Sequence, residues 1–144
     1  MAQSATRSTV HEYLAAFNDR DDETLQSLVA DDVVVHGVHD VTSGRQSVID
    51  HMERHFAAFP DYSGERHTVV HDDDIVSVRY TARGTHTGEY KGVEPTELPV
   101  SWTGMAMYRV DDGEIVEIWI EEDRLGLLEQ LKVIETTEPA HLRI

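Results

Sequence analysis

The chain has 144 residues, enough for a domain that buries a hydrophobic core and a small-molecule cavity. It has no cysteine, which excludes disulfides and thiolate metal sites, and no apolar run approaches the ~20 residues that span a bilayer. Acidic residues number 28 against 12 basic ones, for a formal net charge of −16. Such a surface repels phosphate backbones and anionic lipids, so we expect no nucleic-acid or membrane partner.

The N-terminus lacks the apolar core of a signal peptide, so we expect a cytoplasmic protein. Lys91 and Lys132 are the only lysines, and aspartate is abundant. This composition suggests a halophile-like acidic surface, on which dissolved salt screens the repulsion between carboxylates. A folded signal that is lost when salt is removed would support this hypothesis, and indifference to salt would contradict it.

The first 60 residues have the spacing of helices with one short strand. Apolar residues recur at helical spacing over 6–20 and 22–30, and a short apolar strand follows over 32–36. A polar connection leads to a third helix that runs to Phe59, where Pro60 stops it because proline cannot donate the next helical hydrogen bond.

From Glu65 onward the apolar period changes to two. Residues 67–71 and 75–86 form a predicted antiparallel pair, and 87–98 read as a loop. A hairpin of 100–110 with 114–122 then leads to a last helix that begins at Asp123. We expect one domain over residues 1–144, with an irregular tail at 135–144.

Helices segregated from an antiparallel run of strands predict an α+β fold. A curved sheet with helices packed in its concavity would make a cone with a pocket inside. Pairing the last hairpin symmetrically about its turn sets Met107 opposite Ile118 and Met105 opposite Ile120, facing the pocket. Trp102, Tyr108 and Trp119 would then lie on the outer sheet face. Because exposed aromatic residues form a costly patch, we expect this face to form a homo-oligomer, a dimer or larger.

Several segments resemble the SnoaL-like polyketide cyclases, a family of the NTF2-like superfamily of α+β cones. The specific ones are Gly84-Thr-His-Thr-Gly88 and Trp119-x-x-x-Asp123-x-x-Gly126; looser matches cover 56–61, 79–89, 92–96, 108–119 and 126–131. The resemblance implies intramolecular aldol cyclisation of a polyketide ester, without a metal or cofactor. It also implies a carboxylate that acts as general acid and base, and Asp123 occupies the matching position.

Each candidate catalytic residue has a structural alternative. A carboxylate at the mouth of an apolar pocket has a raised pKa, which suits a base; yet Asp123 also stands where a helix N-cap is needed. His86 ends the apolar face of its strand and could donate to a substrate oxygen or bond to backbone. His36 ends the first strand and has a similar argument for contacting substrate.

The predicted pocket wall is apolar and aromatic. Its expected members are Phe17, Phe56, Phe59, Met105, Met107 and Ile118, although most such residues form ordinary core. A metal site is not indicated, because His51 and His55 share a helix face without an assignable third ligand.

The sequence leaves three functions open. The first is a cyclase or an isomerase like ketosteroid isomerase, in which a carboxylate removes a carbon-bound proton. The second is hydrolysis in the manner of the epoxide hydrolases of this superfamily, which needs a second polar group to hold a water near Asp123. The third is a non-catalytic module that binds a hydrophobic ligand, in which Asp123 merely caps its helix.

Overall fold

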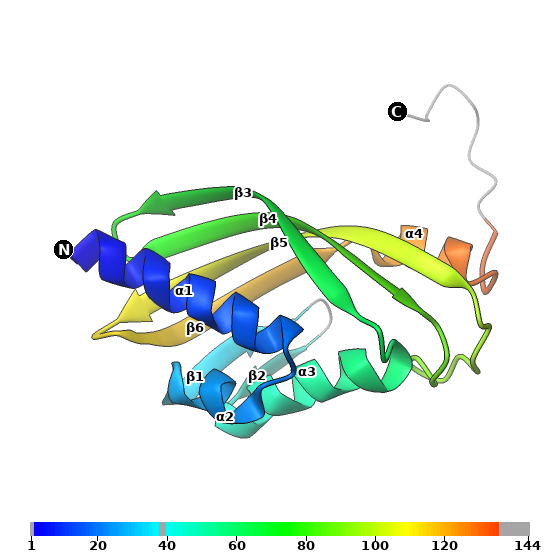
Figure 1. Ribbon diagram of the computed structural model, residues 1–144, viewed down its shortest axis with the longest axis horizontal. Coiled ribbons are helices and arrows are strands. Elements are labelled where there is room, and N and C mark those ends of the chain that lie inside the picture. The colour runs from blue at the N-terminus through cyan, green and yellow to red at the C-terminus, as the bar shows by residue number, and fades with distance from the viewer. Residues whose placement is uncertain (1, 38–39, 136–144) are drawn as a thin grey trace.

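The computed structural model describes residues 2–37 and 40–135, and it has the predicted α+β architecture (Figure 1). One six-stranded sheet has the order β2-β1-β6-β5-β4-β3. The helices are α1 (Ala2–Asn18), α2 (Asp22–Ser27), α3 (Arg45–Ala58) and α4 (Arg124–Gln130). The strands are β1 (Val29–His36), β2 (Val41–Ser43), β3 (Ser63–Asp72), β4 (Ile75–Thr85), β5 (Pro99–Asp111) and β6 (Glu114–Glu122). Among the described residues, no helix is both long and apolar enough to cross a membrane.

The sheet is mixed and curved, and α1 and α3 lie on its concave side (Figure 1). Strands β3 to β6 form an antiparallel meander, whereas β1 pairs with β6 in parallel. The short strand β2 pairs with β1 and lies in the segment for which only a polar connection was predicted. The tail expected at 135–144 lies outside the described residues, except for Glu135.

Local chemistry explains where the helices end. Helix α3 ends at Ala58, one residue before the predicted end at Phe59, which forms the C-cap just before Pro60. The Asp123 carboxylate accepts the Gly126 N–H at the start of α4. On α1, Val10, Tyr13 and Ala16 are buried at helical spacing, which fixes the face that packs on the sheet.

The register of the last hairpin differs from the predicted one by one residue. A β-bulge leaves Val116 without a partner, so Tyr108 pairs with Ile118 and Ala106 with Ile120. The inward direction predicted for Ile118 is correct, but the assignment of the two faces of β5 was wrong. Trp102, Ala106 and Tyr108 are buried on the concave side.

The outer face of the sheet therefore has a different composition from the predicted one. Met105 and Met107 are 57% and 42% exposed, because alternation on β5 directs them away from the concavity. Trp119 does lie on this face, opposite Met107. Of the three aromatic residues expected outside, only Trp119 is there.

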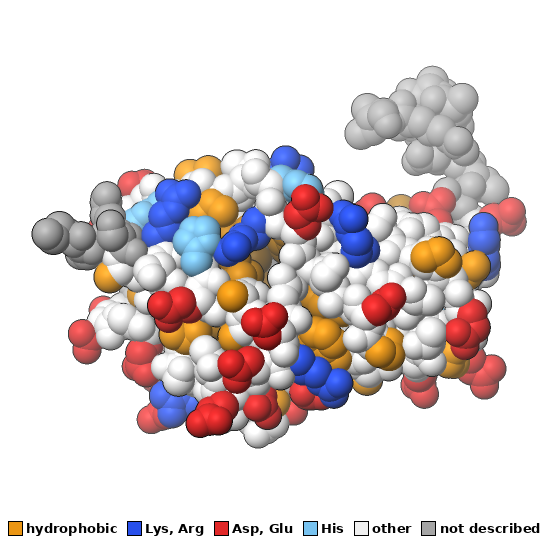
Figure 2. All heavy atoms as spheres, viewed as in Figure 1, with side chains coloured by type: hydrophobic (Ala, Val, Ile, Leu, Met, Phe, Trp, Pro, Cys, Tyr) orange, Lys and Arg blue, Asp and Glu red, His pale blue; other side chains and the backbone are white. Residues whose placement is uncertain are grey.

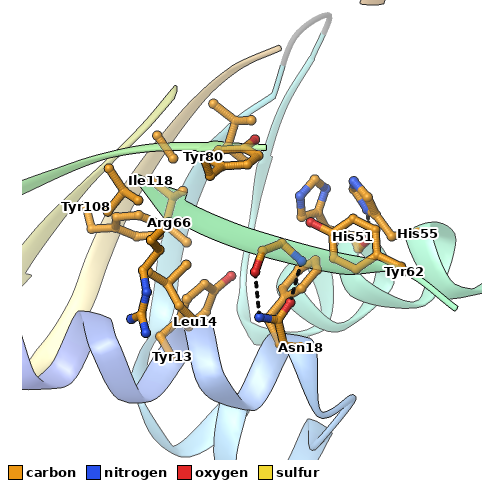
Figure 3. Close-up of a pocket in the computed structure, with 15 residues that line it drawn as sticks. Tyr13, Leu14, Asn18, His51, His55, Tyr62, Arg66, Tyr80, Tyr108 and Ile118 are labelled. Atoms are coloured by element: carbon orange, nitrogen blue, oxygen red, sulfur yellow. Dashed lines mark hydrogen bonds between the residues drawn. The ribbon is translucent and has the colours of Figure 1, made fainter. Parts of the chain in front are cut away.

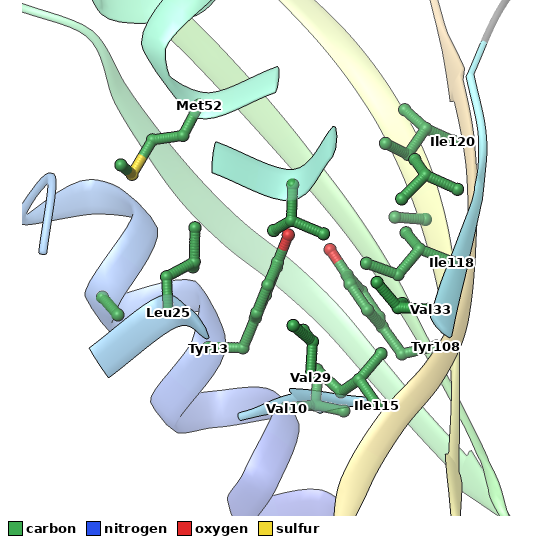
Figure 4. Packing of buried hydrophobic residues seen from close by; sticks show 14 of the residues in the cluster. Val10, Tyr13, Leu25, Val29, Val33, Met52, Tyr108, Ile115, Ile118 and Ile120 are labelled. Carbon is green, nitrogen blue, oxygen red and sulfur yellow. The ribbon is translucent and has the colours of Figure 1, made fainter. Parts of the chain in front are cut away.

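Two buried clusters fill the concave side. The larger joins α1, α2 and α3 to the sheet, and in it the rings of Tyr13 and Tyr108 lie side by side, with centroids 5.6 Å apart (Figure 4). The smaller packs Phe59, Trp102, Leu127 and other side chains beneath α4. Part of the concave side is left unfilled, in a space lined mainly by side chains of the larger cluster.

Candidate active site

A cavity lies between α1, α3 and the concave face of β3 to β6 (Figure 3). About 60 Å³ of it is open to the centre of a water molecule. Figure 2 shows a hollow with hydrophobic side chains at its bottom, between α1 and β3. Aromatic and aliphatic side chains dominate the wall: Tyr13, Leu14, Phe17, Tyr62, Val78, Tyr80, Ala106, Tyr108, Ile118 and Ile120, with Asn18, His51, His55, Gly64 and Arg66.

Helix α1 is attached to β3 across one side of this cavity. The Asn18 side chain donates to the Gly64 carbonyl at 2.9 Å and accepts the Gly64 N–H at 2.9 Å (Figure 3). This pair of bonds has the pattern that a neighbouring strand would form with Gly64. It satisfies the N–H and the carbonyl of Gly64, which would otherwise lack partners. The wall formed by α1 is therefore held in a fixed position.

The tyrosines of the wall are neutral. Burial raises the pKa of Tyr13, Tyr62, Tyr80 and Tyr108 above the ordinary value of 10, because a phenolate would be poorly solvated there. The charge of Glu122 adds to this effect on Tyr62, Tyr80 and Tyr108. Each phenol retains its O–H, which can donate to an oxygen of a bound ligand.

A second, more polar hollow adjoins the cavity, and we call it the mouth. About 390 Å³ of it is open to the centre of a water molecule. It shares His51, His55 and Ile120 with the cavity wall, so the two spaces meet at these side chains. The rest of its lining consists of Gly37, Asp40, Arg54, Ala57, Glu89, Tyr90, Lys91, Trp102, Glu122 and Arg124.

Glu122 is the carboxylate on the concave face of β6 where the mouth meets the sheet. Its Oε2 accepts the Trp102 indole N–H at 2.5 Å. In the register of the sheet, Tyr80, Gly104 and Glu122 form one row across β4, β5 and β6. A Cβ on Gly104 would approach the Tyr80 ring to 2.5 Å, so the glycine makes room for that ring beside Glu122.

His55 and His51 stand on successive turns of α3 at the boundary between cavity and mouth. The His55 Nδ1–H donates to the His51 carbonyl at 2.8 Å, so in the neutral ring Nε2 carries the lone pair. Burial lowers the pKa of His55, against an opposing effect of the Glu122 charge, and lowers that of His51 well below 6.5. Both rings are therefore neutral at pH 7.

The expectation that Asp123 faces the pocket was wrong. Its side chain is exposed, its Oδ1 accepts the Gly126 N–H at 2.9 Å, and it does not line the cavity or the mouth. The physical reason is its position one residue beyond β6, where the first free amides of α4 attract the carboxylate. Glu122, the preceding residue, is the one that points inward.

His86 also does not reach the cavity. It is 0% exposed and lies beneath the loop that follows β4, where its Nδ1 accepts the Thr96 N–H at 3.1 Å. Its ring packs against Phe59 at a centroid distance of 5.7 Å. The structural alternative, a histidine bonded to backbone at the end of its strand, is the arrangement that the structure has.

His36 lies on the outer face rather than at the cavity. Its Nε2 is 2.6 Å from Glu117 Oε2, and its ring stacks on Trp119. Glu117 also pairs with Arg109 at 2.6 Å. The end of β1 therefore presents this histidine to a charged surface network and not to a ligand in the concavity.

The predicted wall residues fall into three groups. Phe17 and Ile118 line the cavity, and their contact with substrate stays a prediction. Phe56 and Phe59 are buried in the two core clusters and do not line it. Met105 and Met107 face outward. They were predicted to face inward because the bulge in β6, which shifts the pairing with β5 by one residue, was not predicted.

Sequence reasoning missed Glu122, Tyr62, Tyr80 and the role of the His51–His55 pair at the cavity. A signal for Glu122 was present, because alternation from Ile118 and Ile120 puts the next inward side chain at 122. The spacing of His51 and His55 was noted, but only as a possible metal pair.

Comparisons with known proteins show the family and the fold of this chain. A family model, SnoaL-like polyketide cyclase, matches residues 7–131. IdmH of Streptomyces antibioticus, a candidate polyketide cyclase, is 36% identical, with a TM-score of 0.78 over 89% of this chain and 99% of that one. AclR of Streptomyces galilaeus, a candidate hydroxylase, is 28% identical, with a TM-score of 0.85 over 97% of this chain and 93% of that one.

A SnoaL-like protein of Jannaschia sp. CCS1 is 17% identical and has a TM-score of 0.85 over 92% of this chain and 95% of that one, which is a likeness of fold. An NTF2-like protein of Cytophaga hutchinsonii is likewise similar in fold, with a TM-score of 0.65 and 16% identity over 85% of this chain and 94% of that one. No curated protein matches the chain. From the family match and the 36% identity to IdmH, this chain belongs to the SnoaL-like polyketide cyclase family, with an NTF2-like fold.

Proposed function

We propose that this protein is a cofactor-independent enzyme that removes a proton from a carbon next to a carbonyl and closes a ring by an intramolecular aldol reaction. The substrate class, a polyketide ester, is taken from the family. One observation carries the proposal: a carboxylate, Glu122, lies on the rigid inner face of β6 where a tyrosine-rich cavity meets its mouth. A partly desolvated carboxylate beside an apolar cavity suits proton abstraction.

The reaction can be written with this chain's own groups. Glu122 takes the carbon-bound proton, and the electron pair of the C–H bond moves to the carbonyl oxygen as an enolate. Neutral phenols such as Tyr80 and Tyr62 donate to that oxygen as its charge develops. The enolate carbon then attacks a second carbonyl of the same molecule, and the resulting alkoxide recovers the proton from Glu122.

Asp123, the carboxylate that the family resemblance indicates, is assigned here to helix capping. The two acidic residues are neighbours in sequence, so the same segment supplies a carboxylate in either assignment. Their side chains differ in environment: Glu122 lines the mouth, whereas Asp123 is exposed. Only the first can contact a ligand that enters the cavity from this mouth.

Proton abstraction can be tested without the natural substrate. 2-Tetralone is a small bicyclic ketone whose C1 protons exchange slowly with D₂O, and NMR measures the exchange. We expect the protein to accelerate this exchange and Glu122→Gln to reduce the acceleration by roughly 100-fold or more, the usual contribution of a general base. Gln keeps an oxygen that can accept the Trp102 N–H.

Glu121→Gln is the matched control, because Glu121 is on the same strand and is exposed on the opposite face. It should leave the exchange rate within about 2-fold of the parent protein, since surface substitutions have small effects. Equal losses in the two variants would contradict the assignment. Binding of 2-tetralone without any accelerated exchange would favour the non-catalytic binding module.

Hydrolysis is a second candidate, and one observation favours it. His55 and Glu122 line the same mouth, so a water held between them would have both a carboxylate and an imidazole partner. Epoxide opening by that water would give a diol with one oxygen from solvent. Incorporation of ¹⁸O from labelled water into the product of a naphthalene epoxide would identify this activity, and its absence would exclude that substrate class.

We also propose that a second copy of the chain covers the outer sheet face. Met107 and Trp119 pair across β5 and β6, and Met105 adds to the exposed apolar area. Sedimentation should show a dimer or larger species at micromolar concentration, and Met107→Glu should shift it toward the monomer. A parent protein that sediments as a monomer would contradict this.

A further inference from the structure

The mouth is lined by three cations that have no ion-pair partner among the described residues. Elsewhere in the described residues, four arginines form ion pairs with carboxylates: Arg20, Arg45, Arg83 and Arg109. Arg54, Lys91 and Arg124 form none within 4 Å among those residues, yet all three line the mouth. Three of the 12 basic residues of the chain therefore lie around one hollow without an ion-pair partner among the described residues.

Three separate elements supply these cations. Arg54 comes from α3, Arg124 from the first residue of α4, and Lys91 from the loop between β4 and β5. Lys91 and Gly92 form a tight turn with φ values of 47° and 86°, closed by two hydrogen bonds between Tyr90 and Val93. A non-glycine residue with positive φ costs free energy, so this turn holds Lys91 at the mouth in a conformation that lysine does not favour.

Lys91 lies close enough to both arginines for their charges to act on it. The pKa of Lys91 is lowered, first by partial burial and then by the charges of Arg124 and Arg54; the opposing effects of Asp40 and Glu122 are smaller. Arg54 and Arg124 also disfavour a proton on His51 and His55, although at His55 the charge of Glu122 has a larger effect in the opposite direction. The mouth therefore carries three cations beside three carboxylates, Asp40, Glu89 and Glu122, and among the described residues none of the three cations forms an ion pair within 4 Å.

We propose that Arg54, Lys91 and Arg124 bind a carboxylate of the substrate, so that the enzyme takes a ligand bearing a free acid at the end that remains in the mouth. An arginine can bind a carboxylate with two parallel hydrogen bonds, and Lys91 adds a point charge. The three carboxylates of the same mouth would repel a phosphate dianion more strongly than a monoanion. The inference rests on the proposed function in one respect: the group recognised in the mouth orients the rest of the ligand toward the cavity and Glu122.

Three fluorescent probes of one ring size test this: 2-naphthoate, methyl 2-naphthoate and 2-naphthyl phosphate. At low ionic strength we expect 2-naphthoate to bind roughly 10-fold more tightly than its methyl ester, the range of a charge-assisted hydrogen bond. The advantage should shrink as NaCl is added, because salt screens the partly exposed cations. Lys91→Met, Arg54→Gln and Arg124→Gln should each weaken binding of the acid about 3- to 10-fold and leave the ester unchanged.

Arg79→Gln is the control, because it removes the same charge from an exposed position on β4 that does not line the mouth. Equal affinities for acid and ester, or an equal loss in the control, would overturn the carboxylate site while leaving the cavity and Glu122 in place. Tighter binding of the phosphate would also overturn it. If neither the acid nor the ester binds, the cavity does not accept a bicyclic aromatic ligand, and this result would contradict the proposed function as well.

Discussion

Strand β6 carries a glutamate on each face that lies close to a histidine, and the two pairs differ in environment. On the outer face, Glu117 contacts both His36 and Arg109, which lower its pKa. On the inner face, Glu122 accepts the Trp102 N–H and shares the mouth with His55, whose pKa is lowered by burial. The outer carboxylate is paired with the Arg109 guanidinium, whereas the inner one accepts the neutral Trp102 N–H and has no ion pair among the described residues.

Under the proposed function, one strand carries a structural carboxylate on its outer face and a reactive one on its inner face. An ion-paired glutamate holds its charge at neutral pH and resists protonation. A glutamate that has neutral hydrogen-bond donors and borders a desolvated cavity can accept a proton during a reaction. The two faces should therefore respond differently to substitution and to pH.

The inner face should tolerate no added bulk at Gly104. Gly104→Ala would bring a methyl group to 2.5 Å from the Tyr80 ring, and we expect a loss of about 1–3 kcal/mol in the free energy of unfolding, measured in urea. Ser101→Ala, on the exposed face of the same strand, should change it by less than about 0.5 kcal/mol. Equal effects would break the distinction between the faces.

Stability should depend on pH through the inner histidines. Because burial holds the pKa of His51 well below 6.5, the unfolded chain binds a proton near pH 6.5 that the folded chain does not bind. Stability is then lost as the pH falls from about 6.5 toward the lower folded-state value, at up to about 1.4 kcal/mol per pH unit. His51→Asn should reduce the dependence of the melting temperature on pH between pH 5 and 7. The same substitution at exposed His67 should not.

Asp123 should behave as a helix cap. Asp123→Ala removes the acceptor for the Gly126 N–H and should cost about 1 kcal/mol of stability, while Asp123→Asn should cost almost nothing, because Asn caps helices as well as Asp. Chemical denaturation distinguishes the two variants. If the Asn variant were as unstable as the Ala variant, capping would not be the structural role of this side chain.

The contacts of Glu117 on the outer face should affect stability at a lower pH than the inner histidines do. Since Arg109 and His36 hold the pKa of Glu117 below 4.5, the stabilisation it provides is present above about pH 4.5 and is lost as the pH falls through the lower folded-state pKa. Glu117→Gln should reduce the acid sensitivity of the melting temperature below about pH 4.5 only. An altered slope near pH 6 in this variant would mean that the two faces are coupled.

Much of the fold could be predicted from apolar periodicity. It predicts the α+β class, three of the four helices with nearly their full lengths, and the four-stranded meander. It does so because each long element buries one regular face. The bulge at Val116 could not be predicted, since β5 carries apolar residues on both faces and alternation alone fits either register. That single extra residue exchanged the predicted positions of Met107 and Tyr108.

The candidate site was less predictable than the fold. Asp123 was chosen from a family pattern, and the sequence contains both a reason for catalysis and a reason for capping at that position. Strand β6 ends at Glu122, as predicted, and the choice between the two reasons depends on the direction of the Asp123 side chain, which turns to the free amides of α4. The mouth was not predicted at all, because Arg54, Lys91 and Arg124 are far apart in sequence and meet only through the packing of α3 and α4 around a loop.

The most direct test compares the two neighbouring carboxylates in one assay. The rate of 2-tetralone deuteration should fall roughly 100-fold or more in Glu122→Gln and stay within a few-fold of the parent rate in Asp123→Asn, with both variants folded. The reverse pattern, a large loss in Asp123→Asn and an unchanged rate in Glu122→Gln, would contradict the assignment of Glu122 as the base.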